Sequence, residues 1–203
     1  MRNKNLLCLV ECAMMVALAF GLSFIKLWQM PLGGSITLCS VLPIMLIGVK
    51  YGPVIGMGTG FVYSLTQLAQ GFMEGDIYFA ANEVHVFIIA MLFDYLVPYT
   101  LIGLSGILGK KNRWIPLGGM GIAVVLRVLC HYFTGVTIWE QWTPEGWSAW
   151  IYSAAYNGGY LIPDALISMA VAVMLFGVKE IRKLVGIGEG ASILNGAGIK
   201  GIN

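Results

Sequence analysis

Long apolar stretches separated by short polar ones run along most of the chain. The pattern predicts six membrane-spanning helices, at residues 5–25, 36–50, 53–71, 84–108, 115–138 and 151–178. A helix needs about 20 apolar residues to cross a bilayer, and only the second segment falls clearly short of that length. Pro43 lies inside this short segment, where neighbouring helices can enclose a proline. We therefore predict an all-α polytopic membrane protein with six transmembrane helices.

The loops between these segments are short, so we expect residues 1–180 to form a single six-helix transmembrane domain. The first apolar segment has the basic start of a signal peptide, but no small-residue cleavage site follows it. We interpret it as a helix that is retained. Residues 181–203 are rich in glycine and show little periodicity, which predicts a poorly ordered tail.

Basic residues predict the orientation of the helices. If the N-terminus is cytoplasmic, ten lysines and arginines fall on the inner side, and only Lys26 falls outside. This asymmetry follows the positive-inside rule, so we expect both termini in the cytoplasm. The outer loops then carry the acidic residues Glu74, Asp76, Glu83, Glu140 and Glu145.

Composition supports a membrane protein and excludes several functions. Of the 203 residues, 58% are apolar and 11% are charged, against about 25% charged in soluble domains. A net charge of +2 is too small to indicate a nucleic-acid partner. The four cysteines lie in apolar runs without a CxxC pair, so we expect neither a disulfide framework nor a metal site.

Motifs typical of enzymes are missing from the sequence. Residues 103–110 resemble a phosphate-binding loop, but the glycine spacing differs and Lys111 stands where that loop has Ser or Thr. The chain has two histidines and no HExxH motif. We therefore expect no ATPase of its own, no cofactor and no covalent chemistry.

Five ionisable residues fall within predicted spans: Glu11, Asp94, Arg127, His131 and Asp164. Each costs a few kcal/mol in the bilayer unless it faces protein or a cavity, so these residues either line a functional site or form structural ion pairs. Helical rise places Asp94 about 15 Å, His131 about 10 Å and Asn157 about 9 Å from the outer ends of their helices. Their depths predict a pocket that is open to the exterior.

Spacing predicts the walls of this pocket. Arg127, His131, Gly135 and Trp139 recur every four residues and therefore share one face of a helix. On that face Gly135 would let a flat ligand approach the backbone, and Trp139 would cover it. The last span carries a second polar stripe, with two tyrosines stacked above it: Asn157, Tyr160, Asp164, Tyr152 and Tyr156.

Two further patterns concern the surface. Trp142 and Trp147 are typical of an interfacial aromatic belt. Small residues recur every four positions on the first span (Ala13, Ala17 and Gly21) and on the third (Gly52, Gly56 and Gly60). Such seams allow close helix packing in membranes. We expect the third-span seam to pack internally, whereas the first-span seam fits either internal packing or a partner protein.

Four segments together resemble one known family. They are residues 11–20, residues 31–38, the run His131-Tyr132-Phe133-Thr134-Gly135 with Trp139 following, and Tyr152 with Asn157 five residues later. From about Leu6 to Lys179 the chain resembles the thiamine-specific substrate-binding (S) components of energy-coupling-factor (ECF) vitamin transporters.

The resemblance implies a function, a site and partners. The implied thiamine-binding residues are Asp94, Tyr95, His131, Gly135, Trp139, Tyr152 and Asn157. The first-helix residues Ala13, Ala17 and Gly21 would contact an energising module, which consists of a transmembrane coupling protein and two cytoplasmic ATPases. Because thiamine is a cation, we further predict that Arg127 pairs with Asp164 and leaves Asp94 available.

The sequence is also compatible with other functions. The protein could be an S component for another flat vitamin or for a thiamine precursor such as hydroxymethylpyrimidine. It could also be a membrane-embedded enzyme that uses Asp94 and His131, or a secondary transporter that works without ATPases.

Overall fold

The computed structural model describes residues 3–77 and 83–188. Its α-helices are α1 (Lys4–Ser23), α2 (Leu42–Tyr51), α3 (Pro53–Glu74), α4 (Val84–Ala90), α5 (Val97–Ile102), α6 (Ile115–Thr137), α7 (Ala149–Gly177) and α8 (Lys179–Val185). A π-helical turn, η2 (Met91–Leu96), joins α4 to α5, and two 3₁₀ turns, η3 (Gly103–Gly106) and η4 (Glu140–Trp142), follow α5 and α6. Two short strands, β1 (Lys26–Gln29) and β2 (Ser35–Thr37), form an antiparallel hairpin.

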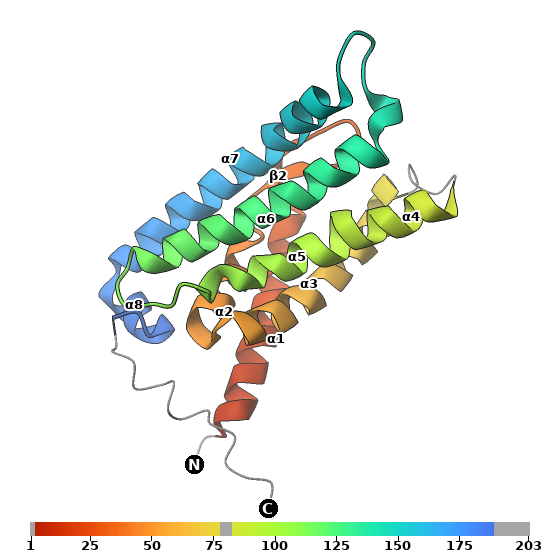
Figure 1. Ribbon diagram of the computed structural model, residues 1–203. Helices are drawn as coiled ribbons and strands as arrows, with labels where there is room; N and C mark the ends of the chain where they lie inside the picture. The colour runs from red at the N-terminus through yellow and green to blue at the C-terminus, as the bar shows by residue number, and fades with distance from the viewer. Residues whose placement is uncertain (1–2, 78–82, 189–203) are drawn as a thin grey trace, which may run out of the picture.

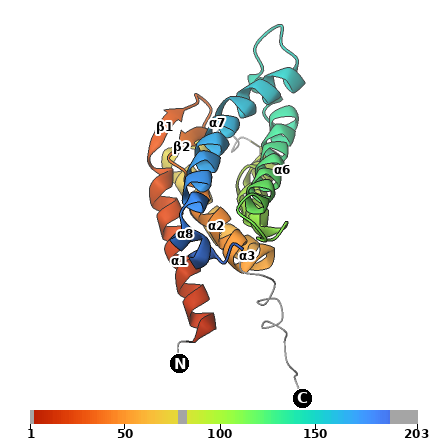
Figure 2. The same ribbon diagram turned by 90° about the vertical axis from the view of Figure 1, so that its left-hand side faces the viewer.

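The helices form a bundle with two distinct ends. The segment from α4 to η3 runs beside α6, and α6 runs beside α7 (Figure 1). The start of α1 and helix α8 lie at one end, whereas the start of α4 and the loop after α6 lie at the other. Figure 2 shows the hairpin packed beside α7, above the end of α1. The apolar core fills the bundle around α2, with Ile44, Met45 and Phe176 almost fully buried.

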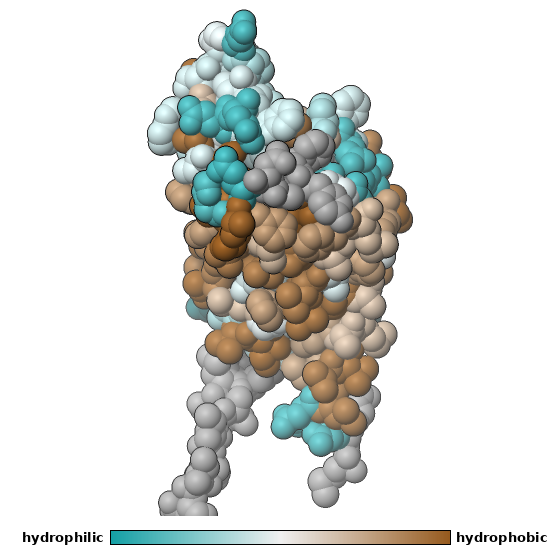
Figure 3. Space-filling view, turned by 90° about the vertical axis from the view of Figure 1, so that its right-hand side faces the viewer, coloured by the Kyte–Doolittle hydropathy of each residue, from teal (hydrophilic) through white to brown (hydrophobic). Residues whose placement is uncertain are grey.

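The helical membrane architecture is confirmed. Four segments are long and apolar enough to cross a bilayer: Lys4–Ser23, Val84–Gly106, Ile115–Thr137 and Ala149–Gly177. Figure 3 shows a belt of apolar side chains between more polar ends, as expected for a surface in contact with lipid. Helix α3 has 22 residues but carries buried polar side chains, among them Gln67 and Gln70. The count of six spans stays a prediction.

The second predicted span, 36–50, is wrong in its first part. Residues 35–37 form strand β2, and the helix that follows begins only at Leu42. Gly33, Gly34 and Cys39 all have positive φ angles, which a helix does not allow. Pro43 therefore stands in the first turn of α2 and not in a helix interior. An N–H group in the first turn has no partner within the helix, so its absence in proline costs no hydrogen bond. At 10 residues, α2 extends only about 15 Å.

Glycines bring helix backbones together on α3, as predicted for this seam. A Cβ atom at Gly56 would lie 2.2 Å from the carbonyl oxygen of Gly103, and one at Gly60 would lie 2.7 Å from that of Tyr99. No side chain fits at such distances, so α3 packs directly against α5 and η3. By contrast, a Cβ atom at Gly52 would meet nothing within 4 Å.

The expected tail begins within the folded part of the chain. Helix α8 spans Lys179–Val185, and Arg182 donates hydrogen bonds to the last carbonyls of α7. Val185 and Ile187 are buried in the core, and the N–H of Gly188 bonds the carbonyl of Lys110 at 2.9 Å. The rest of the predicted tail, 189–203, lies outside the described residues.

Candidate functional site

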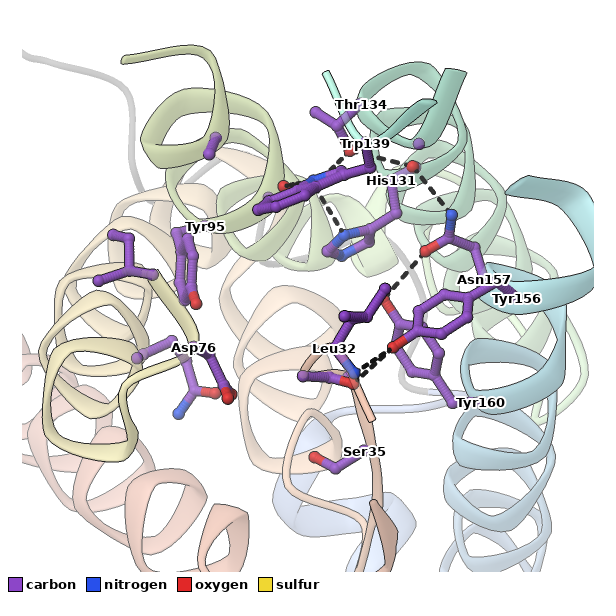
Figure 4. Close-up of a pocket in the computed structure, with 18 of the residues that line it drawn as sticks. Leu32, Ser35, Asp76, Tyr95, His131, Thr134, Trp139, Tyr156, Asn157 and Tyr160 are labelled. Atoms are coloured by element: carbon purple, nitrogen blue, oxygen red, sulfur yellow. Dashed lines mark hydrogen bonds and ion pairs between the residues drawn. The ribbon is translucent and has the colours of Figure 1, made fainter. Parts of the chain in front are cut away.

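A cavity of about 150 Å³ opens between the hairpin, the C-terminal half of α3 and the facing sides of η2, α6 and α7. A cavity of that size accommodates at least one six-membered aromatic ring. All seven residues predicted for the pocket line it: Asp94, Tyr95, His131, Gly135, Trp139, Tyr152 and Asn157. Figure 4 labels Tyr95, His131, Trp139 and Asn157 among them. Residues about sixty positions apart in the sequence therefore meet at one site.

Asp94 lies on the π-helical turn and is fixed by three donors. Its carboxylate accepts hydrogen bonds from Trp139 Nε1 at 2.8 Å, from His131 Nδ1 at 3.2 Å and from the Thr134 hydroxyl. Pro98 lacks the N–H that would bond the Asp94 carbonyl in an α-helix, which favours the wider turn here. Asp94 thus joins the α4–α5 segment to α6 and to the loop after it.

Two buried nitrogens on α6 remain without partners among the described residues. Because the Asp94 carboxylate only accepts, Nδ1 of His131 carries the proton and Nε2 is left as an acceptor. His131 Nε2 and Arg127 Nε are buried and make no hydrogen bond within the described part of the chain. Both residues line the cavity. Buried polar atoms of this kind normally have partners, so these two suit a ligand or bound water.

Arg127 pairs with Asp164, as predicted, and not with Asp94. Arg127 Nη1 lies 3.2 Å from Asp164 Oδ2, and its guanidinium carbon lies 4.8 Å from the ring centroid of Tyr99. The other oxygen of Asp164 accepts from the backbone N–H of Thr37 at 2.9 Å and from its hydroxyl at 2.8 Å. This buried pair ties the base of the hairpin to α6 and α7.

The contact between α6 and α7 corrects one expectation about Gly135. A Cβ atom at Gly135 would lie 2.1 Å from Ser153 Oγ, so the missing side chain makes room for Ser153 and not for a ligand. Asn157 spans the same contact, since its Nδ2 donates to the His131 carbonyl at 3.1 Å. Its Oδ1 accepts from the Tyr160 hydroxyl at 3.2 Å. Asn157 therefore holds the two helices together at the wall of the cavity.

The turn of the hairpin covers part of the cavity. The hydroxyl of Tyr156 accepts from the N–H of Leu32 at 3.1 Å and donates to the carbonyl of Gly33 at 3.0 Å (Figure 4). A Cβ atom at Gly34 would lie 2.8 Å from the ring of Tyr160, so the turn rests directly on that ring. Sequence reasoning missed this cover, although consecutive glycines are a turn signal.

The side of the cavity formed by α1, β1 and α3 was also missed. A chain of hydrogen bonds links Ser23 to Gln70, Gln70 to Glu74 and Gln67 to Gln70, at 2.6, 2.9 and 3.0 Å respectively. Lys26 completes the chain through an ion pair with Glu74 at 2.5 Å. Gln67 and Gln70 stand three residues apart in an apolar segment, and this spacing was a readable signal of a polar helix face.

The aromatic residues in and around the loop between α6 and α7 divide between the cavity and the surface. Trp142 was expected in an interfacial belt, but it lines the cavity. Trp147 is 53% exposed, consistent with its predicted interfacial place. Tyr152 and Tyr156 are in contact as predicted, with ring centroids 5.8 Å apart.

The structure shows the surroundings of two features of α1 that the sequence singled out, Glu11 and the seam of small residues. Glu11 forms an ion pair with Lys50 at 2.5 Å and accepts from the Tyr51 hydroxyl at 2.8 Å, so it joins α1 to the end of α2. Ala13, Ala17 and Gly21 are all exposed, and a Cβ atom at Gly21 would meet nothing within 4 Å. This seam is not used for packing within the described part of the chain.

Comparisons with known proteins agree with one another. The model of a family described as "Thiamine transporter protein" matches residues 9–184. A protein named Thiamine transporter ThiT from Bacillus subtilis is 31% identical over 189 residues, covering 86% of this chain and 93% of its own length. The ThiT of Lacticaseibacillus paracasei is 24% identical over 191 residues, covering 87% of this chain and 88% of its own. A solved structure of ThiT from Listeria monocytogenes superimposes with a TM-score of 0.73 at 26% identity, covering 90% of this chain and 99% of that one.

Proposed function

The chain belongs to the thiamine transporter protein family, and from this premise we propose that it captures thiamine at the outer side of the membrane as the S component of an ECF-type transporter. The observation that carries the proposal is the cavity that contains Asp94, held in place by His131, Thr134 and Trp139. The relatives are named transporters, which favours transport over catalysis by the same residues.

The chemistry of the cavity suits thiamine. Thiamine joins a flat cationic thiazolium ring to an aminopyrimidine that both donates and accepts hydrogen bonds. Trp139 and Tyr152 offer aromatic faces, and a cation over such a face gains about 0.5–2 kcal/mol. His131 Nε2 and Arg127 Nε supply one acceptor and one donor for polar ligand atoms. A cavity that hydrogen-bonds its ligand in this way rejects analogues without those groups.

A direct binding measurement tests the proposed capture. Thiamine is titrated into the purified protein in detergent while tryptophan fluorescence is recorded, with Trp139 in the cavity wall as a reporter. We expect saturable quenching at nanomolar thiamine that is lost in Asp94→Asn and in His131→Ala. Glu180→Gln is the matched control, because Glu180 lies on α8 and does not line the cavity.

The same assay separates thiamine from its precursor. If the site takes the whole vitamin, hydroxymethylpyrimidine competes far more weakly than thiamine. Equal competition would reassign the protein to precursor uptake. Folded protein that binds no thiamine at high micromolar concentration would refute the proposed function.

We further propose that the exposed seam of α1 docks on the transmembrane coupling protein, whose two cytoplasmic ATPases drive uptake. Small residues allow a partner helix to approach closely, and Ala13, Ala17 and Gly21 present such a surface. Ala13→Trp should leave thiamine binding intact and abolish uptake into cells. Met14→Trp is the control, since Met14 is 66% exposed on a neighbouring face of α1. Equal loss of uptake in both variants, or loss of binding in Ala13→Trp, would contradict this role.

A further inference from the structure

The outer side of the cavity carries an unbalanced negative charge. Lys26, Glu74 and Asp76 all line the cavity at the end of α3 and the start of β1. Lys26 and Glu74 neutralise each other through an ion pair at 2.5 Å. Asp76 has no such partner, because its carboxylate makes no hydrogen bond or ion pair within residues 3–77 and 83–188. Asp76 therefore leaves this side of the cavity with one uncompensated negative charge.

Asp76 stands where the hairpin turn meets the cavity. A Cβ atom at Gly33 would lie 3.1 Å from Asp76 Cγ, so the turn packs directly over the carboxyl group. Figure 4 shows Asp76 below Tyr95, on the opposite side of the cavity from Asn157 and Tyr160. The side chain is half-buried between the turn and the cavity. A ligand that fills the space would exclude water from this carboxylate.

The two carboxylates of the cavity differ in how much of their bonding capacity is used. A carboxylate offers about four acceptor positions, and protein donors already occupy three of them at Asp94. At Asp76, by contrast, no described residue donates a hydrogen bond to any acceptor position of the carboxylate. At the floor of the cavity, the positive charge of Arg127 is matched by its ion-pair partner Asp164. Among the described residues that line the cavity, the carboxylates without a Lys or Arg partner are therefore Asp94 and Asp76, and of these two Asp76 has all of its acceptor positions available to a cationic ligand.

We propose that Asp76 is the residue that sets the charge preference of the cavity, because its carboxylate faces the cationic ring of the bound vitamin. This inference rests on the proposed capture of thiamine and deepens it. Burial and, to a smaller extent, Glu74 raise the pKa of Asp76 above its ordinary value, and Lys26 opposes part of this shift. A cation bound beside the carboxylate counteracts that shift, so ligand and carboxylate stabilise each other.

Removing the charge of Asp76 tests this role. The dissociation constants of thiamine and of 3-deazathiamine, a neutral isostere with thiophene in place of thiazolium, are measured for the wild-type protein and for Asp76→Asn. For each protein, the dissociation constant of 3-deazathiamine is divided by the dissociation constant of thiamine. We expect Asp76→Asn to lower this ratio roughly tenfold, because the lost interaction acts on the charged ligand alone. Effects of the substitution on shape or packing change both constants and cancel in the ratio.

Two further variants make the result specific. Asp76→Glu keeps the charge and should keep the ratio close to that of the wild type. Glu140→Gln removes an exposed carboxylate from η4 that does not line the cavity, and it should leave the ratio unchanged. If Asp76→Asn binds thiamine with an unaltered ratio, the inference is overturned while the proposed capture stands. If the wild-type protein binds no thiamine, the proposed capture itself is overturned.

Discussion

Replacing Asp164 by asparagine removes the charge of the ion pair at the cavity floor while preserving the shape of the side chain. Asp164 is 1% exposed and accepts three hydrogen bonds, one from Arg127 and two from Thr37. The Nδ2 group of asparagine donates hydrogen bonds at a position where a carboxylate oxygen accepted them. It would therefore face another donor, from either Arg127 or Thr37. Arg127, itself 7% exposed, would then be left as a buried charge without a counter-ion.

Breaking a buried ion pair by removing one partner costs about 3–5 kcal/mol of folding free energy. For a protein of this length, each kcal/mol shifts the unfolding midpoint by about 2–4 °C, so Asp164→Asn should lower it by about 6–20 °C. Thermal unfolding of the ligand-free protein in detergent, followed by tryptophan fluorescence, measures the shift.

The double variant Arg127→Met/Asp164→Asn tests whether the loss comes from the unpaired charge. Once the cation is also removed, asparagine can orient its oxygen toward Thr37, and the double variant should unfold at a higher temperature than Asp164→Asn alone. Residues in direct contact are expected to show this kind of non-additivity. If the shifts of the two single variants simply add in the double variant, our account of the pair is refuted.

Three further substitutions test packing and site geometry. Gly56→Ala places a methyl group against a backbone carbonyl, whereas Gly58→Ala meets nothing within 4 Å; only the former should lower the yield of folded protein in size-exclusion chromatography. Trp139→Phe keeps an aromatic ring but loses the 2.8 Å bond to Asp94, so thiamine affinity in the titration should fall roughly tenfold. Tyr156→Phe removes both hydrogen bonds to the hairpin turn, and stopped-flow fluorescence should then show thiamine dissociating several-fold faster. An unchanged dissociation rate would mean that these bonds do not retain the ligand.

Helix depth and helical periodicity were sufficient to predict one wall of the cavity. Asp94, His131 and Asn157 lie at similar depths on three spans, and the structure links them through hydrogen bonds. These inferences succeeded because a membrane helix has a fixed rise and its polar side chains avoid lipid. The pairing of Arg127 with Asp164 was predicted on a different ground, namely that a cationic ligand requires Asp94 to remain available, and the structure shows this pair.

The hairpin could not be predicted from hydropathy. Residues 36–50 are mostly apolar, and a buried strand followed by a short helix has the same hydropathy as one helix. The deciding features are backbone conformations, above all the positive φ angles of Gly33, Gly34 and Cys39. These depend on where the turn contacts Tyr160, which is 126 residues further along the chain than Gly34. Asp76 was missed for another reason: a carboxylate in a loop is ordinarily solvated, and only the folded structure places this one at the cavity.

The environment of Asp94 has a thermodynamic consequence for ligand binding. Three of the side chains around the cavity, those of His131, Thr134 and Trp139, are held by one carboxylate through contacts within the protein itself. Immobilising a side chain on binding costs about 0.5–1.5 kcal/mol, so this preorganisation spares a ligand roughly 1.5–4.5 kcal/mol of conformational entropy. That difference corresponds to about a tenfold to a thousandfold gain in affinity without any additional contact. Folding therefore supplies part of the order that ligand binding would otherwise have to create.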